Sequence, residues 1–202
     1  MGGLILGILG GTFNPVHMGH LIMADDARDQ LALDRVLWVL TPKPPHKNWA
    51  AVIDAQLRLE MLAIAIKDQP AFEVSLVDIN RAPPYYAVDT MQLLRRQYPE
   101  AQLIYLMGED SLRDLPGWHQ PDAFLSSCDG IGVMCRSGVT VDLTAINDYL
   151  PGVREKVRYL DTPFVEISAS DIRKRVAQGR SYRYYLPSGV YDYIEAHQLY
   201  RA

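Results

Sequence analysis

Cysteine is scarce in this chain of 202 residues, which contains only Cys128 and Cys135. Their spacing matches neither a CxxC pair nor a zinc-finger pattern, and two cysteines do not make the disulfide framework of a small secreted domain. Hydrophobic residues make up 49% of the chain, which is enough for a core of its own. We therefore expect a cytoplasmic protein.

An excess of positive charge is also lacking, because the net charge is −4. Binding along a nucleic-acid backbone normally needs a basic surface, so we expect no nucleic-acid partner, whereas small anionic ligands remain compatible. Long hydrophobic runs are absent too. The apolar residues 4–9 are too short for a membrane span or a signal core and follow no basic residue, so they predict a buried strand and no membrane partner.

The chain does contain a regular alternation of short apolar runs and helical patterns, which is typical of an α/β fold with a parallel sheet. We predict strands at residues 4–9, 35–40, 72–79, 102–107 and 130–135, the last being the final parallel strand. Helices are predicted to begin near residues 21, 54, 88, 170 and 188. After Pro151 the pattern changes, with a short strand at residues 157–160. We predict a core of residues 1–150 and a C-terminal segment of residues 151–202.

The most informative segment is residues 10–20, GGTFNPVHMGH, directly after the first predicted strand. Glycines followed by His17 and His20 at a helix start place backbone N–H groups, the helix dipole and two imidazoles around one anion. Capping histidines are the ordinary alternative. A metal pair is another, but no nearby carboxylate or cysteine completes a ligand set, so we predict no metal ligand here. Gly19 keeps a side chain out of the space between the imidazoles.

A second candidate site is residues 167–175, ISASDIRKR. Its ordinary explanation is a helix start capped by Ser168 or Ser170, with the basic residues in solvent. The functional alternative is a polyphosphate clamp, in which the serine hydroxyls, free helix N–H groups and the Arg173 guanidinium bind phosphate oxygens. The local excess of basic residues in an acidic chain favours the clamp.

Two weaker signals complete the set. The stiff loop at residues 41–47, TPKPPHK, is either a plain connection or a support that holds His46 or Lys47 over a phosphate. Gly108, Glu109 and Asp110 follow a buried strand, which places two carboxylates at the carboxyl end of the sheet, where ligands bind in open α/β folds.

Taken in order, six motifs resemble those of the bacterial nicotinate mononucleotide adenylyltransferase family over nearly the whole chain: GGTFNPVHMGH, PKPPHK, YYAVDT, MGED with a downstream GW, ISASDIR and YYLPSGVYDYIEAHQLY. HxGH alone marks the wider nucleotidyltransferase superfamily, whereas the ordered set selects this family. The resemblance implies a Rossmann-like doubly wound parallel sheet with a small C-terminal helical part. It also implies adenylyl transfer from ATP to nicotinate mononucleotide (NaMN), giving deamido-NAD and pyrophosphate.

The resemblance further implies roles for individual residues, all of them in phosphate or ring binding. His17, His20, Lys47 and Arg173 are expected to be catalytic. The expected ATP-binding residues are Gly10, Gly11, Thr12, Phe13, Gly19, Ile167, Ser168 and Ser170. The expected mononucleotide-binding residues are Lys47, Tyr86, Ala87, Gly108, Asp110 and Trp118, the last either stacked on the pyridine ring or an ordinary half-buried tryptophan. Mg²⁺, bound mainly through the ATP phosphates, is the expected cofactor.

Two positions depart from the family pattern. Asn14 stands where the family often has Asp, which costs little because either side chain stabilises a tight turn. Tyr85, Tyr86 and Ala87 replace an SYT segment, so the hydroxyl contact to the nicotinate carboxylate is not expected, whereas the backbone N–H groups of Tyr86 and Ala87 can still supply donors. Two alternatives remain open here: another adenylyltransferase of the superfamily, such as one acting on phosphopantetheine, and a nucleotide-sensing module without turnover.

Overall fold

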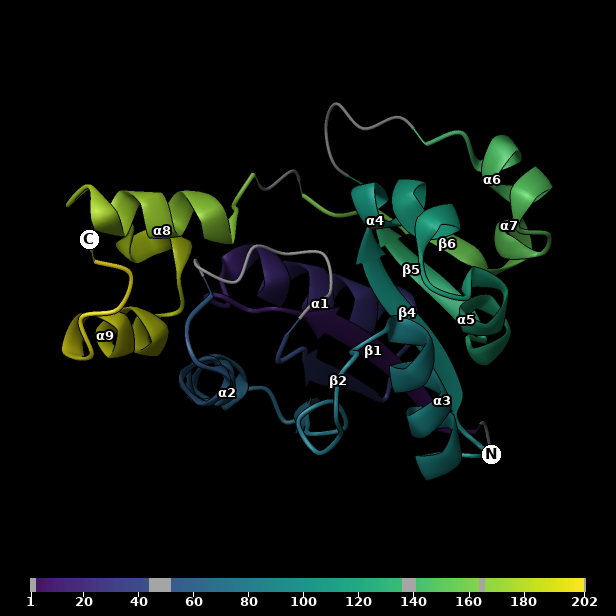
Figure 1. The fold of residues 1–202 in the computed structure, drawn as a ribbon, viewed down its shortest axis with the longest axis horizontal. Coiled ribbons are helices and arrows are strands. Elements are labelled where there is room, and N and C mark those ends of the chain that lie inside the picture. Colours follow the sequence, from purple (N-terminus) through teal and green to yellow (C-terminus); the bar gives the residue numbers. More distant parts are fainter. Residues whose placement is uncertain (1–2, 44–51, 136–140, 164–165, 202) are drawn as a thin grey trace.

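The computed structural model describes residues 3–43, 52–135, 141–163 and 166–201, and its centre is a six-stranded sheet (Figure 1). Every strand pair is parallel, in the spatial order β3-β2-β1-β4-β5-β6. The strands are β1 (Ile5–Gly11), β2 (Arg35–Leu40), β3 (Phe72–Ser75), β4 (Gln102–Gly108), β5 (Gly130–Met134) and β6 (Val157–Leu160). This order leaves a crevice between the carboxyl ends of β1 and β4, where the direction of winding reverses. The predicted Rossmann-like fold class is confirmed.

Two hydrophobic cores lie on the two faces of the sheet, because its strands bury side chains on both. One core contains side chains from α1 (Met18–Gln30), α2 (Ala55–Ile66), α8 (Ala169–Ala177) and α9 (Ser188–Ala196). The other contains side chains from α3 (Ala87–Gln97), α4 (Glu109–Asp114), α5 (Pro121–Ser127), α6 (Leu143–Tyr149) and α7 (Val153–Lys156). Along β2, Trp38 enters the first core while Leu37 and Val39 enter the second, the alternation expected of a strand.

The C-terminal helices α8 and α9 lie at one end of the molecule, next to α1 and α2 (Figure 1). Ile172 of α8 and Ile194 of α9 are fully buried in the first core. Tyr193 of α9 donates a hydrogen bond of 2.5 Å to Glu60 of α2, which ties the two helices together. None of the helices within the described ranges is long and apolar enough to cross a membrane.

The structure corrects three boundaries predicted from the sequence. The strand predicted at residues 72–79 ends at Ser75, because the chain turns at residues 77–80. The first strand runs on through Gly10 and Gly11, which pair in register with Val39 and Leu40, so these glycines end the strand rather than form the turn. The strand at residues 130–134 is not the last parallel strand, because β6 pairs with it in parallel.

Candidate functional site

Two adjoining cavities open at the carboxyl ends of β1 and β4, in the crevice that the strand order creates. The larger has a volume of about 660 Å³ and the smaller about 290 Å³. Gly10, Gly11 and Thr12 line both, and so does Trp118. The end of β1 is therefore a thin wall between two spaces, each of a size that suits half of a dinucleotide.

The larger cavity is enclosed by segments from the two ends of the chain. The first segment supplies Gly10, Gly11, Thr12, Phe13, Asn14, His17 and His20, and the second supplies Ile167, Ser168, Ala169, Ser170 and Arg173. His17 is the N-cap of α1 and Ser168 the N-cap of α8, so the positive ends of two helix dipoles abut one cavity. This arrangement favours a ligand that carries several negative charges.

The two histidines are stacked at the start of α1, with ring centroids 3.7 Å apart and planes inclined by 28°. The backbone N–H of His17 donates to Nδ1 of His20 at 3.2 Å. Because Nδ1 accepts this bond, the ring proton of His20 lies on Nε2, which can donate to a ligand. Phe13 packs edge-on against His20 at 5.1 Å and restricts its ring further.

Arg173 reaches from α8 to the turn after β1, where its Nη1 donates to the carbonyl oxygen of Asn14 at 2.8 Å. The hydroxyl of Tyr200 donates to Oδ1 of the same Asn14 at 2.9 Å. Burial raises the pKa of Tyr200, against the opposing effect of Arg173 and Arg58, so this hydroxyl stays protonated as a donor. Asn14 is thus fixed from two sides, and the Arg173 guanidinium is held at the edge of the larger cavity.

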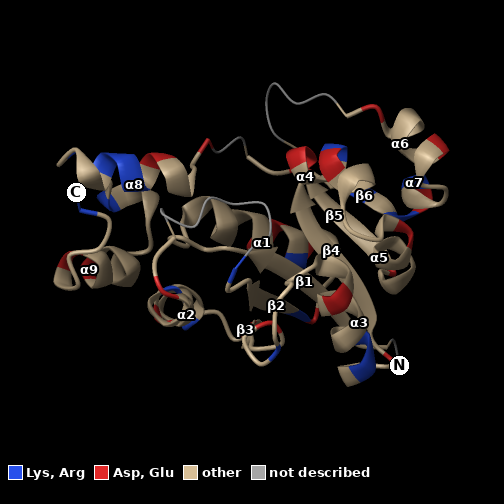
Figure 2. Cartoon of the chain, in the orientation of Figure 1, with Lys and Arg blue, Asp and Glu red and all other residues tan. Residues whose placement is uncertain are grey.

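Ser168 performs the capping role that was its ordinary explanation. Its Oγ accepts from the Asp171 backbone N–H at 3.0 Å and donates to the Asp171 carboxylate at 2.8 Å. After this acidic first turn, α8 carries the basic residues Lys174 and Arg175, which Figure 2 shows as a blue band. A Cβ added at Gly19 would lie 3.2 Å from Nδ1 of His17 and 3.7 Å from the Ile167 carbonyl oxygen, so a side chain there would displace the His17 ring.

Gly10 is required by a close contact at the wall between the cavities. A Cβ at this position would lie 2.8 Å from the hydroxyl oxygen of Tyr105, on the neighbouring strand β4. Tyr105 is buried, and burial raises the pKa of its hydroxyl, so the group remains neutral. Any larger residue at position 10 would force either Tyr105 or the wall itself to move.

The smaller cavity has an aromatic lining. Tyr86 stacks on His119 with centroids 4.1 Å apart, and half-buried Trp118 meets the ring of Tyr105 edge-on at 6.1 Å. Ala87 begins α3 beside them, and its N-cap Tyr86 provides no side-chain hydrogen bond to the helix start. Such a space suits a flat ring that also carries a polar group able to accept from backbone N–H groups.

One buried arginine binds the backbone of the turn that follows β1. Arg58 of α2 is 1% exposed and donates to four carbonyl oxygens. These belong to Thr12 at 2.7 Å, Thr41 at 3.1 Å, Pro42 at 2.7 Å and Ile53 at 3.0 Å. Burial lowers the pKa of Arg58, opposed by Tyr200 and Asp54. The guanidinium thereby fixes the turn after β1 and the chain on either side of residues 44–51.

Most of the residues predicted for the site line one or both cavities, as described above. Gly108 and Asp110, expected on the mononucleotide side, line the larger cavity and not the smaller one. Lys47 and His46 lie outside the described residues. Five further residues that no sequence motif predicts line the smaller cavity: Asp78, Thr90, Tyr105, Ser111 and His119. Two of these residues could have been predicted from the sequence. His119 directly follows Trp118, and Tyr105 carries a hydroxyl among the aliphatic residues of its strand.

The larger cavity has few side chains that are suited to ligating a metal ion directly. Within the described ranges, no group of three or more His, Cys, Asp or Glu side chains could hold a metal ion. Asp110 is the one carboxylate among the described residues lining this cavity, and it is accompanied by His17, His20 and Arg173. This donor set fits an Mg²⁺ ion that is held by phosphate oxygens and water rather than by a protein cage.

Comparisons with known proteins agree with this architecture. The cytidylyltransferase-like family model matches residues 8–175. A probable nicotinate-nucleotide adenylyltransferase of Thermomicrobium roseum is 46% identical and covers 97% of this chain and 91% of its own length. One from Roseiflexus is 42% identical, covering 97% and 98%. The solved Plasmodium falciparum nicotinic acid mononucleotide adenylyltransferase complexed with NaAD has the same fold, with a TM-score of 0.79 at 18% identity, covering 98% of this chain and 97% of its own.

Proposed function

The chain belongs to the cytidylyltransferase-like family and, within it, to the nicotinate-nucleotide adenylyltransferases. From this premise we propose that it transfers the adenylyl group of ATP to NaMN, giving deamido-NAD and pyrophosphate. The observation that carries the proposal is the pair of cavities divided by Gly10, Gly11 and Thr12, one lined by anion-binding groups and the other by aromatic rings. We place the reaction in the cytoplasm, in keeping with the scarcity of cysteine.

ATP occupies the larger cavity in this proposal. His17 and His20 bind its phosphates from the start of α1, while Ser170, Arg173 and the free N–H groups of α8 bind the outer phosphates. NaMN occupies the smaller cavity with its pyridine ring against Trp118, and the backbone N–H groups at Tyr86 and Ala87 bind the carboxylate. Asp110 serves a ribose at the junction.

The reaction is a direct in-line displacement. An oxygen of the NaMN phosphate attacks the α-phosphorus of ATP, the bond from this phosphorus to its bridging oxygen breaks, and pyrophosphate leaves with the electron pair. Ser168, whose hydroxyl has an adjacent carboxylate, is engaged in capping α8 through Asp171, so we assign it no covalent role. The chain acts by holding the two phosphates in line and by neutralising developing charge. His20 Nε2–H, Arg173 and Lys47 supply the positive charge and donors.

Mg²⁺, when bound to the ATP phosphates, neutralises part of the triphosphate charge. The protein's contribution is to orient those phosphates, through the N-terminal ends of α1 and α8, and to leave room for the water that completes the metal's coordination. Among the described residues that line the larger cavity, Asp110 is the one that carries a carboxylate.

The proposal is tested by pyrophosphate release from ATP and magnesium in the presence of NaMN, nicotinamide mononucleotide or phosphopantetheine. We expect rapid release with NaMN. Preferential release with phosphopantetheine would show a different transferase of the superfamily. Binding of ATP without release from any acceptor would show a nucleotide-sensing module.

Replacing Arg173 by alanine is expected to lower kcat/KM for ATP by about 10²- to 10³-fold, because a preorganised donor to developing phosphate charge is lost. Lys174→Ala is the matched control, since it removes one positive charge from the exposed side of the same helix. Steady-state kinetics on both variants measure the effect. Equal kinetics for the two variants would show that Arg173 only braces Asn14.

A further inference from the structure

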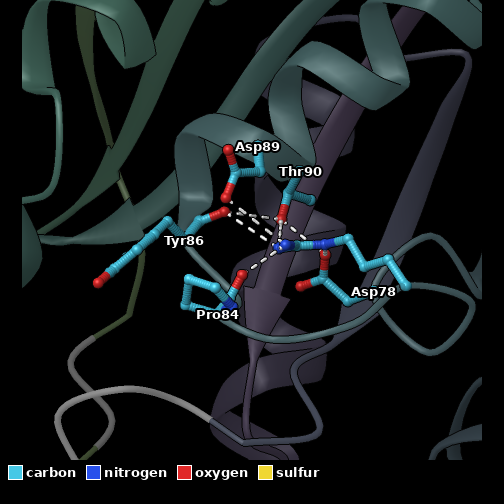
Figure 3. Close-up of polar contacts among 6 residues, drawn as sticks. Asp78, Pro84, Tyr86, Asp89 and Thr90 are labelled. Atoms are coloured by element: carbon cyan, nitrogen blue, oxygen red, sulfur yellow. Dashed lines mark hydrogen bonds and ion pairs between the residues drawn. The ribbon is translucent and has the colours of Figure 1, made fainter.

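A buried ionic cluster lies directly behind the wall of the smaller cavity. Figure 3 shows Asp78, Pro84, Tyr86, Asp89 and Thr90 arranged around one guanidinium group, that of Arg81. Asp78 and Thr90 are 2% and 4% exposed and line the cavity, whereas Arg81 is not among its lining residues. The cluster belongs to the turn after β3 and to the start of α3, so it connects two segments that form the cavity.

The first property of the cluster is its charge balance. Arg81 Nε donates to Asp78 Oδ1 at 2.9 Å, and its Nη1 lies 3.5 Å from Asp89 Oδ2. Asp78 is the one carboxylate, and Lys and Arg are missing, among the described residues that line the smaller cavity. Arg81 is therefore the cation that balances Asp78 at the edge of this space, and an ionised Asp78 without that partner would repel an anionic ligand.

The second property is its grip on the backbone. Arg81 donates to the carbonyl oxygens of Pro84 at 2.6 Å and of Tyr86 at 3.3 Å, and its guanidinium lies 5.1 Å from the centre of the Tyr85 ring. Thr90 donates to Asp78 at 2.8 Å and so links the first turn of α3 to the same cluster. With its carbonyls turned toward Arg81, the segment before α3 is fixed relative to the N–H groups that begin the helix.

We propose that Arg81 is a positioning residue that sets the preference of the smaller cavity for a mononucleotide whose pyridinium ring bears a carboxylate. It does so by neutralising Asp78 and Asp89 and by fixing the segment that leads into α3. The inference rests on the proposed function. It explains why a pocket lined by the Asp78 carboxylate accepts the carboxylate of nicotinate in preference to the uncharged amide of nicotinamide.

Arg81→Gln is the decisive variant, because it removes the charge and keeps a polar side chain. We expect kcat/KM for NaMN to fall about 10- to 100-fold, which is the effect of one unit charge about 6 to 12 Å away at an effective dielectric constant of about 20. The kcat/KM for nicotinamide mononucleotide should not fall, because its ring bears no carboxylate, and the KM for ATP should change less than about threefold, because ATP occupies the larger cavity. Arg35→Gln, in an exposed pair with Glu73 at the opposite end of the sheet, is the matched control.

Two further variants separate charge from position. Arg81→Lys keeps the charge but lacks the planar fork, so it should retain the NaMN preference at reduced kcat/KM. Asp78→Asn removes the negative charge and should raise the preference for NaMN; combined with Arg81→Gln it should restore part of what that variant loses. If thermal unfolding shows that Arg81→Gln does not fold, the preference for NaMN over nicotinamide mononucleotide is measured in Asp78→Asn and Arg81→Lys instead.

The inference is overturned if the ratio of kcat/KM for NaMN to kcat/KM for nicotinamide mononucleotide is unchanged in Arg81→Gln. If that variant is unfolded, an unchanged ratio in Asp78→Asn overturns it. Failure of the proposed function gives a different result: the wild-type protein would then release no pyrophosphate with NaMN at all.

Discussion

Replacing His20 by alanine is expected to lower kcat by about 10²- to 10³-fold, the usual cost of removing one preorganised donor to developing charge. The KM for NaMN should change little, because His20 lines the larger cavity and not the smaller one. Steady-state rates of pyrophosphate release with both substrates varied measure the two effects separately. Near-normal turnover would contradict the role assigned to His20.

The control for this variant has to remove an imidazole without touching the cavities. His197→Ala serves, since that ring is exposed at the end of α9 and stacks on Tyr193 at 4.0 Å. His20→Ala also removes the acceptor of the His17 backbone N–H, which costs about 1 kcal/mol of stability as a lost cap. A thermal unfolding curve therefore accompanies the kinetics, and a modest fall in Tm with a large fall in kcat is the expected combination.

Arg58→Met is expected to lower the free energy of unfolding by about 3–5 kcal/mol, because four carbonyl oxygens lose a charged donor in a space closed to water. Arg58→Lys should lose less, since an ammonium group keeps the charge and reaches fewer of these oxygens. Urea unfolding at constant pH measures both. A loss below about 1 kcal/mol for Arg58→Met would show that its surroundings collapse or admit water.

Arg35→Met provides the comparison, because it removes an arginine whose ion pair with Glu73, at 3.4 Å, is half exposed. Exposed pairs contribute about 0–1 kcal/mol, so this variant should be close to wild type. The two variants are expected to differ in free energy of unfolding because Arg58 is buried and has four acceptors, whereas Arg35 is half exposed and has one among the described residues.

The sequence predicted the central strands well, and the reason is physical. β1, β2 and β4 are buried on both faces, so each appears as an uninterrupted apolar run that ends at a glycine or a polar turn. The helices α4 to α7 were not predicted, because each has four to seven residues and too few turns for a periodic pattern. The end of β3 was misplaced, because apolar residues continue beyond Ser75, at Leu76, Val77 and Ile79, into a turn.

The candidate site was predictable where one continuous segment carried it. Residues of the segments 10–20 and 167–173 are both expected to bind ATP, and members of both line one cavity. The lining of the smaller cavity was harder to predict from the sequence, because Asp78, Thr90 and His119 come from three separate segments and none belongs to a local pattern. Arg58 and Arg81 look like ordinary surface residues of a helix and a turn, and only their burial reveals what they hold.

The two hydrogen bonds on Asn14 set an order of assembly for the protein. Their donors, Arg173 and Tyr200, lie 159 and 186 residues further along the chain, so both bonds close very long loops. Because long-range contacts require the closure of long loops, we expect this turn to close late in folding. A nascent chain that ends after the first five strands lacks the residues from Ile167 to Arg173 that line the larger cavity, and a chain that stops before Tyr200 lacks the donor to the Asn14 side chain.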